Sequence, residues 1–134
     1  MNEEIQALAE HRMTRAHEAL KDGDHLLAEQ SARGAVNRFY YAAFYAARSL
    51  LATRGLDSSR HSGVITLFHK HFVKTGLVSS ANARALSRSF EKRQKTDYAD
   101  FVSVTVEEAQ ALRRETASFV VECEAVLPLL VAEP

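Results

Sequence analysis

Residues 38–51 read RFYYAAFYAARSLL, a run of aromatic and small apolar residues without glycine or proline. Apolar side chains in and around this run recur at the spacing of one helical face, namely Val36, Tyr40, Ala43, Ala47, Leu50 and Leu51. Gly55 follows as the residue type favoured just after a helix ends. The pattern predicts a long helix from about Asp24 to Arg54 that forms the spine of the fold.

The opposite flank of this helix carries small residues at Ala35, Ala42, Ala46 and Ser49. Small side chains allow a second helix to pack at a short interaxial distance. Residue spacing alone leaves two sources for that helix open, a neighbouring segment of the same chain or a second subunit.

Helical signals continue on both sides of the spine. Residues 3–21 repeat apolar positions at a helical period, and residues 22–24, Asp-Gly-Asp, are typical of a turn followed by a new helix cap. Ser59 can cap a third helix that runs through Lys74 and is closed by Gly76.

Two further helices are predicted in the second half of the chain. Ser79 or Ser80 can cap a helix that runs to about Asp97. Thr105 followed by Glu108 has the spacing of a capping box, and apolar positions after it keep the helical period.

Composition agrees with an all-helical protein. The chain has 134 residues, of which 46% are hydrophobic and 25% charged, and it contains only 5 Gly and 2 Pro. This is too little turn chemistry for a β-sandwich or barrel. We therefore expect an all-α fold, an antiparallel bundle of four to five helices, with residues 1–134 forming one domain.

Other features favour a cytoplasmic protein. Cys123 is the single cysteine, which excludes an internal disulfide and suits a reducing compartment. Residues 1–13 include three glutamates and no apolar run, unlike a targeting peptide. The longest apolar stretch, residues 119–131, is interrupted by charges and a proline, so no membrane-spanning segment is expected.

Charge is distributed unevenly, although the formal net charge is +0. Residues 60–95 hold 8 Lys or Arg and 1 Asp or Glu, whereas residues 97–134 hold 2 and 8. A basic segment of this kind can attract an anionic partner at contact range, because salt screens only beyond about 8–10 Å. The alternative is that the two segments neutralise each other as packed neighbours.

The predicted fourth helix concentrates these cations. At helical spacing, Arg84, Arg88, Lys92 and Lys95 form one stripe that could hold nucleic acid.

Arg93 and Asp97 instead fall on the arc of the same helix that faces the core. Opposite charges on such an arc are costly unless they pair with each other or line a cleft. The sequence therefore predicts either a structural ion pair or a cleft-lining pair, with Tyr98 beside it.

Histidines mark the predicted third helix. His61 and His71 share an arc with apolar residues and should face the core or its rim, and His61 lies in the first turn beside Arg60, where free backbone N–H groups attract anions. His69 and His71 point in different directions on a helix and cannot chelate one ion. Without other ligand clusters or a glycine-rich phosphate loop, we expect no metal and no cofactor.

Four segments in this order resemble the HEPN superfamily: Arg38–Leu51, Arg60–Ile65, Phe72–Gly76 and Phe90–Tyr98. The resemblance covers about residues 15–125 and is closest to small stand-alone prokaryotic HEPN proteins that are often encoded beside a minimal nucleotidyltransferase. It implies a helical bundle, a homodimer and, as in many members, a metal-independent endoribonuclease that acts as a toxin or in RNA-directed defence.

The chain departs from the catalytic signature of that family, which is an arginine and a following histidine separated by four to six residues. Arg93 is followed by Gln-Lys-Thr-Asp-Tyr, with no later histidine. The resemblance therefore places Arg93, Asp97 and Tyr98 in the site, with His61 as a further candidate.

Metal-free RNA cleavage needs a base, an acid and positive charge. Arg93 can supply the charge, Asp97 or His61 the base, and Tyr98 a proton. An alternative is a non-catalytic module that binds RNA or a nucleotide, or docks the nucleotidyltransferase, through Arg60 and the four cations of the stripe. A third is a helical dimerisation protein whose charges serve solubility.

Overall fold

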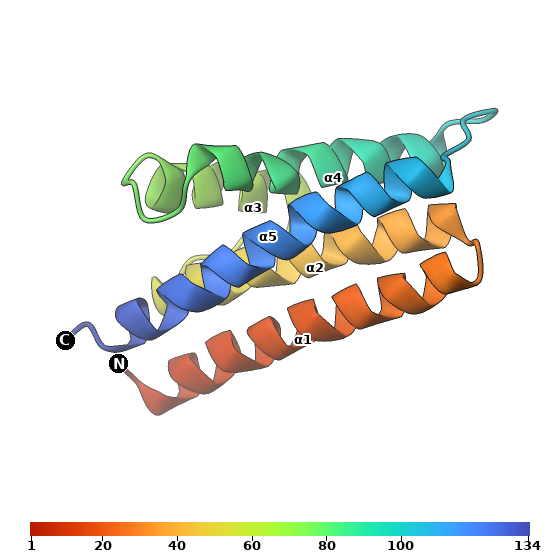
Figure 1. Cartoon of the computed structure of the whole chain (residues 1–134). Coiled ribbons are helices and arrows are strands. Elements are labelled where there is room, and N and C mark those ends of the chain that lie inside the picture. Colours follow the sequence, from red (N-terminus) through yellow and green to blue (C-terminus); the bar gives the residue numbers. More distant parts are fainter.

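A computed structural model describes all residues, 1–134. Its elements are α1 (Glu3–Ala28), α2 (Ala32–Thr53), α3 (His61–Phe68), a five-residue π-helical segment η1 (His69–Val73), α4 (Ser80–Tyr98) and α5 (Val106–Val131). The predicted all-α bundle is confirmed, with α1, α2, α4 and α5 running lengthwise and both termini at one end (Figure 1).

Helix α2 is central, as its apolar pattern predicts. It is packed by α1 on one side and by α4 and α5 on others, and Tyr40, Leu50 and Leu51 are fully buried. The small flank of α2 is covered by α1 of the same chain, where the Oγ of Ser49 donates a hydrogen bond to the carbonyl of Ala9 at 2.6 Å. Of the two sources left open for the helix that covers this flank, the structure shows the neighbouring segment of the same chain.

The predicted turn at residues 22–24 is wrong. Helix α1 continues to Ala28, and the chain reverses at Gln30, which has a positive φ of 63°. Gly23 is buried inside α1, where an added Cβ would overlap the ring of Phe39. The glycine permits two helices to approach closely, and sequence spacing alone made it look like a turn residue.

Two predicted caps are confirmed, and the third is wrong. The side chains of Ser79 and Thr105 accept hydrogen bonds from the backbone N–H groups of Asn82 and Glu108. Arg60, and not Ser59, precedes the first turn of α3, and the α-helix ends at Phe68. Residues 69–73 then widen into the π-helical segment, a form that recurs at functional sites.

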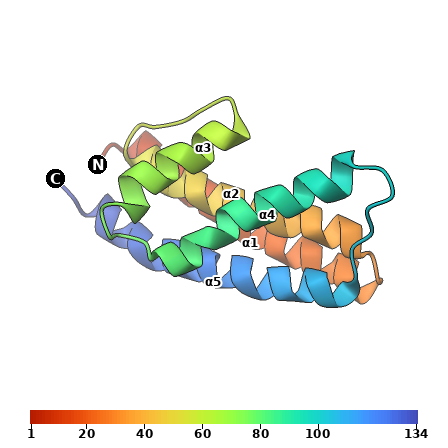
Figure 2. The same ribbon diagram turned by 90° about the horizontal axis from the view of Figure 1, so that it is seen from above.

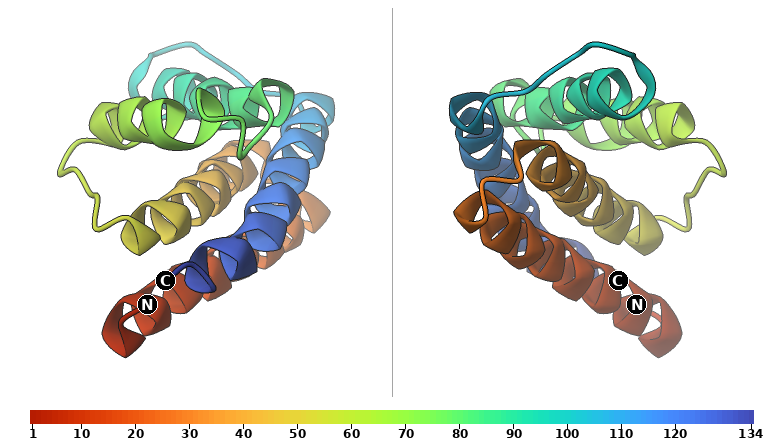
Figure 3. Two further views of the ribbon diagram at one scale, coloured as in Figure 1. Left: turned by 90° about the vertical axis from the view of Figure 1, so that its left-hand side faces the viewer. Right: turned by 90° about the vertical axis from the view of Figure 1, so that its right-hand side faces the viewer.

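Helix α3 packs against α2, and its Val64 and Phe68 are buried in the core. Figure 2 shows α3 and α4 diverging from the turn at residues 74–79, and Figure 3 shows the loop after α2 reaching outward to the start of α3.

Cys123 is fully buried in α5, and burial raises the pKa of its thiol well above the usual range. None of the helices combines the length and apolar character needed to cross a membrane.

Candidate functional site

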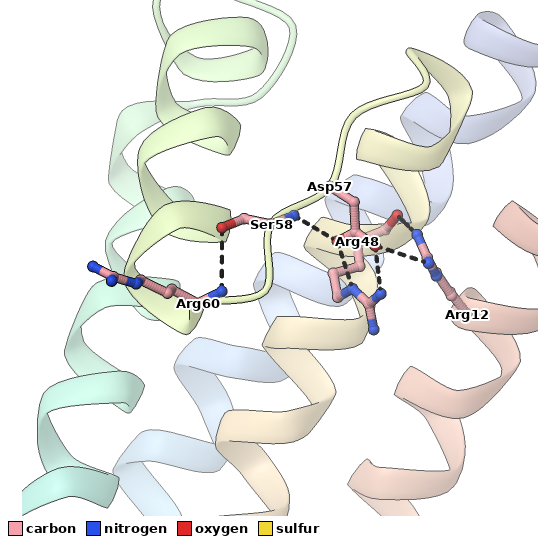
Figure 4. A network of polar contacts seen from close by, with 5 residues as sticks. All are labelled: Arg12, Arg48, Asp57, Ser58 and Arg60. Carbon is pink, nitrogen blue, oxygen red and sulfur yellow. Dashed lines mark hydrogen bonds and ion pairs between the residues drawn. The ribbon is translucent and has the colours of Figure 1, made fainter.

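The loop before α3 is held by two arginines that converge on one carboxylate (Figure 4). Asp57 accepts a hydrogen bond from Arg48 at 2.8 Å and a longer one from Arg12 of α1 at 3.5 Å. Arg12 also donates to the backbone carbonyl of Arg48 at 3.1 Å. The hydrogen bond from Arg48 holds the pKa of Asp57 below its usual range.

Further hydrogen bonds connect this cluster to the first turn of α3. The backbone N–H of Ser58 donates to Asp57 at 2.8 Å, and the hydroxyl of Ser58 accepts from the backbone N–H of Arg60 at 3.2 Å. Gly63 leaves room for Ser58, since a Cβ there would overlap the serine side chain. The loop is thereby fixed directly before His61.

His61 is held by aromatic side chains of α2. Its Nδ1 lies 2.5 Å from the hydroxyl oxygen of Tyr40, and its ring stacks on Phe44 with a centroid distance of 4.4 Å. Nε2 makes no hydrogen bond within the chain and is not buried. Burial lowers the pKa of His61, and the charges of Arg93 and Arg48 lower it further. The neutral imidazole is therefore favoured, with Nε2 available to a ligand.

Arg93 lies among three tyrosine rings. Its guanidinium carbon is 5.4 Å from the ring centroids of both Tyr40 and Tyr41 and 5.7 Å from that of Tyr98. The Arg93 side chain is 12% exposed. Aromatic faces attract a cation, so they stabilise the charge of Arg93 where water is scarce.

Asp97 completes the setting of Arg93. Its Oδ2 lies 3.3 Å from Nε of Arg93, although the N–H of that nitrogen does not point along a hydrogen bond. The same oxygen accepts a hydrogen bond from Asn37 of α2 at 3.1 Å. Asn37 in turn accepts from Arg38 at 2.7 Å. The Asp97 carboxylate is thus engaged toward α2 and orients Arg93.

A cavity of about 660 Å³ brings the candidates together between α3 and α4. Its lining includes Arg60, His61, Arg93 and Tyr98, whereas Asp97 does not line it. The structure therefore contains the Arg93–Asp97 ion pair and also places Arg93 on a cavity wall, so both alternatives for this pair hold in part. A cation, a neutral imidazole and an exposed phenol then face one space large enough for a nucleotide unit.

The cationic stripe of α4 is divided. Arg88 forms an ion pair with Glu115 at 3.2 Å, and Lys92 pairs with Glu108, both acids belonging to α5. Arg84 and Lys95 form no ion pair. Mutual neutralisation of the basic and acidic segments, left open by the sequence, occurs for half of the stripe.

Several residues of this site were missed from the sequence. Tyr40 was assigned only to the apolar core, yet a buried tyrosine needs a partner for its hydroxyl, and that requirement was a usable signal. Asn37, Arg48 and Asp57 gave no comparable signal, because their partners lie on other elements.

No group of three or more His, Cys, Asp or Glu side chains is arranged to hold a metal ion.

Comparisons with known proteins place the chain in a family. A model described as "HEPN domain" matches residues 9–126. A UPF0332 protein of Thermotoga maritima is 39% identical over 119 residues, which cover 89% of each chain. A protein of Methanocaldococcus jannaschii named "Putative toxin MJ0605" is 38% identical over 120 residues, covering 90% of this chain and 86% of the relative. The chain therefore belongs to the HEPN domain family.

Proposed function

We propose that this protein is a metal-independent endoribonuclease and the toxin-like component of a two-component system. The observation that carries the proposal is that His61 of α3 and Arg93 of α4 line one cavity. Family membership and two relatives that carry the name "Putative toxin" support the same assignment.

The reaction proposed here is attack of a ribose 2′-hydroxyl on the adjacent phosphorus. Nε2 of neutral His61 takes the proton of that hydroxyl, a step that requires the tautomer in which Nδ1 carries the ring hydrogen and faces the Tyr40 oxygen 2.5 Å away. The 2′-oxygen bonds to phosphorus and the 5′-oxygen leaves, which gives a 2′,3′-cyclic phosphate and a 5′-hydroxyl.

Charge and a proton are also needed in the transition state. Arg93 stabilises the negative charge that develops on the phosphate oxygens. Tyr98, 71% exposed and with its hydroxyl 3.4 Å from Arg93, donates a proton to the leaving 5′-oxygen, and the proton held by His61 then returns to Tyr98 through solvent.

In this proposal Asp97 is a positioning residue. Its carboxylate is already occupied by Arg93 and Asn37, and it lies off the cavity wall. His61 therefore takes the role of base, for which both residues were candidates.

Cleavage of tRNA and total RNA in EDTA at low salt tests the proposal, with products resolved on a denaturing gel. Wild type should give discrete products, and His61→Gln and Arg93→Ala should give far less product at the same time points. The matched controls are His11→Gln and Arg114→Gln, which alter exposed residues far from the cavity in sequence and absent from its lining. Equal cleavage by all five proteins would assign the activity to a contaminant, and no cleavage by wild type would refute the proposal.

One observation favours a second function, RNA binding without cleavage. No histidine follows Arg93, so the arginine–histidine spacing of the family's catalytic signature is absent at this position. Salt-dependent binding of RNA by wild type without any product would support this alternative.

The proposal includes assembly as a homodimer that docks a small nucleotidyltransferase. Its support is the family resemblance. Light scattering on the purified chain, and copurification with the product of the adjacent gene, test the two parts separately.

A further inference from the structure

A second cavity, of about 600 Å³, lies between α3 with η1 on one side and α4 on the other. Its polar lining comprises His69 and three cations, Lys70, Lys74 and Arg84, together with hydroxyl groups at Thr66, Ser80 and Ser87. No acidic residue lines this cavity or the cavity at His61 and Arg93.

The two cavities follow one another along the same faces of α3 and α4. On α4, Ser80 and Ser87 line the second cavity and Gln94 lines the first, at intervals of seven residues that keep one helical face. On α3, Ser62 lines the first cavity and Thr66 the second, one helical turn apart. We name the two cavities together the α3–α4 groove.

Unpaired positive charge collects in this groove. Lys70, Lys74 and Arg84 form no ion pair, whereas Arg88 and Lys92 of the same α4 helix pair with acids of α5. The division follows the faces of α4: the cations that face α5 are neutralised, and Arg84, which faces α3, is left free. A channel with one sign of charge raises the local concentration of a polyanion.

The lining favours contact with a sugar–phosphate backbone over contact with bases. Phe68, the aromatic residue of the second cavity, is 1% exposed, so its ring gives no platform for stacking a base. Lysine, arginine and hydroxyl side chains are the usual partners of phosphate and ribose oxygens. Recognition in this part of the groove should therefore be independent of sequence.

We propose that the α3–α4 groove carries one strand of RNA from the cleavage site at His61 and Arg93 to a second phosphate-binding site at Lys70, Lys74 and Arg84. Arg84 and Arg93 are nine residues apart on α4, an axial rise of about 13.5 Å at 1.5 Å per residue. A stacked strand advances about 3.4 Å per nucleotide, so the second site meets a phosphate about four nucleotides from the cleaved bond. The inference rests on the proposed function, because it takes the first cavity as the cleavage site.

Chimeric oligonucleotides test it. Each carries one ribonucleotide in an otherwise deoxy strand, so that the cleavable bond is fixed, and has one to six nucleotides on its 5′ or its 3′ side. We expect kcat/KM to rise at least tenfold as one side grows to about four nucleotides, and to stay level as the other side grows. Lys70→Gln/Arg84→Gln should lose this gain and cleave the shortest substrate as wild type does.

The matched control is Lys21→Gln/Arg114→Gln, which removes the same two charge types outside both cavities. Equal gain with length in both double variants, or no dependence on length in wild type, would overturn the inference while cleavage itself upheld the proposed function.

If wild type cleaves neither the chimeras nor long RNA, the proposed function fails, and the groove is then tested by fluorescence anisotropy with all-deoxy strands. Two results together would support it: longer strands bind wild type more tightly, and the salt slope falls by about 0.7 for each phosphate that Lys70→Gln/Arg84→Gln no longer binds. The groove would be refuted if affinity did not depend on strand length. It would also be refuted if inorganic phosphate alone displaced the strands completely.

Discussion

The hydroxyl of Tyr40 lies 2.5 Å from Nδ1 of His61 and fixes which nitrogen of that imidazole faces the cavity. Tyr40→Phe keeps the ring and removes this partner. We expect kcat to fall about tenfold with little change in KM, since a base that is oriented less well loses part of the 10²- to 10⁴-fold contribution of general base catalysis. Steady-state kinetics on a defined RNA measures this split, and a change confined to KM would contradict it.

Acidity should affect cleavage less than the usual histidine pKa suggests. Burial and the nearby charges of Arg93 and Arg48 lower the pKa of His61, so the neutral form persists at pH values where a free histidine, with a pKa near 6.5, is mostly protonated. The acidic limb of kcat/KM should therefore have its midpoint below about pH 6.5. In Arg93→Gln, whose residual rate is followed in single-turnover reactions, this limb should move toward higher pH. If the midpoint of the acidic limb is unchanged in Arg93→Gln, the limb does not report the titration of His61.

Substitutions at Arg93 and Asp97 should lower kcat by different factors. Arg93→Ala removes the cation that faces the phosphate and should lower kcat by about 10²- to 10³-fold. Asp97→Asn keeps an acceptor for Asn37 but weakens the orientation of Arg93, and should cost about tenfold. Single-turnover rates with saturating enzyme compare the two, and an equal or larger loss in Asp97→Asn would indicate that Asp97 touches the reacting atoms.

The loop before α3 should depend on the charge of Asp57. Asp57→Asn weakens the bonds from Arg48 and Arg12, so amide hydrogen exchange should accelerate in residues 54–61 and stay unchanged in α5. Since the lowered pKa of Asp57 means that the fold favours its ionised form, this protection is complete above the unfolded value near 3.9 and is lost as pH falls through the lower, folded value. Exchange measured by mass spectrometry tests both statements, and uniform acceleration would contradict the local role.

Packing of α1 on α2 should tolerate no side chain at Gly23. Gly23→Ala places a methyl group against the Phe39 ring and should lower the free energy of unfolding by about 1–3 kcal/mol, despite the better helix propensity of alanine. Urea denaturation measures the change. Adding Phe39→Leu should recover part of the loss, and a stabilised single variant would show that the two helices separate easily.

Local signals in the sequence predicted most of the fold. Ser79, Thr105 and the apolar face of α2 act through neighbours within a few residues, so spacing alone was enough to identify them. The end of α1 was misplaced because the reason for Gly23 is a ring on another helix. The same limit applies to the site: the core-facing position of Arg93 was readable from its helix, but its cavity shared with His61 depends on the packing of both α3 and α4 against α2.

The buried state of Cys123 makes the protein convenient for site-specific labelling. A thiol that is fully buried, with its pKa raised, reacts slowly with maleimides at neutral pH. A cysteine introduced on an exposed surface, for example at Ser118, would be modified selectively without first replacing the native one. Fluorescent or spin labels can then report on binding and helix movement in the otherwise unaltered chain.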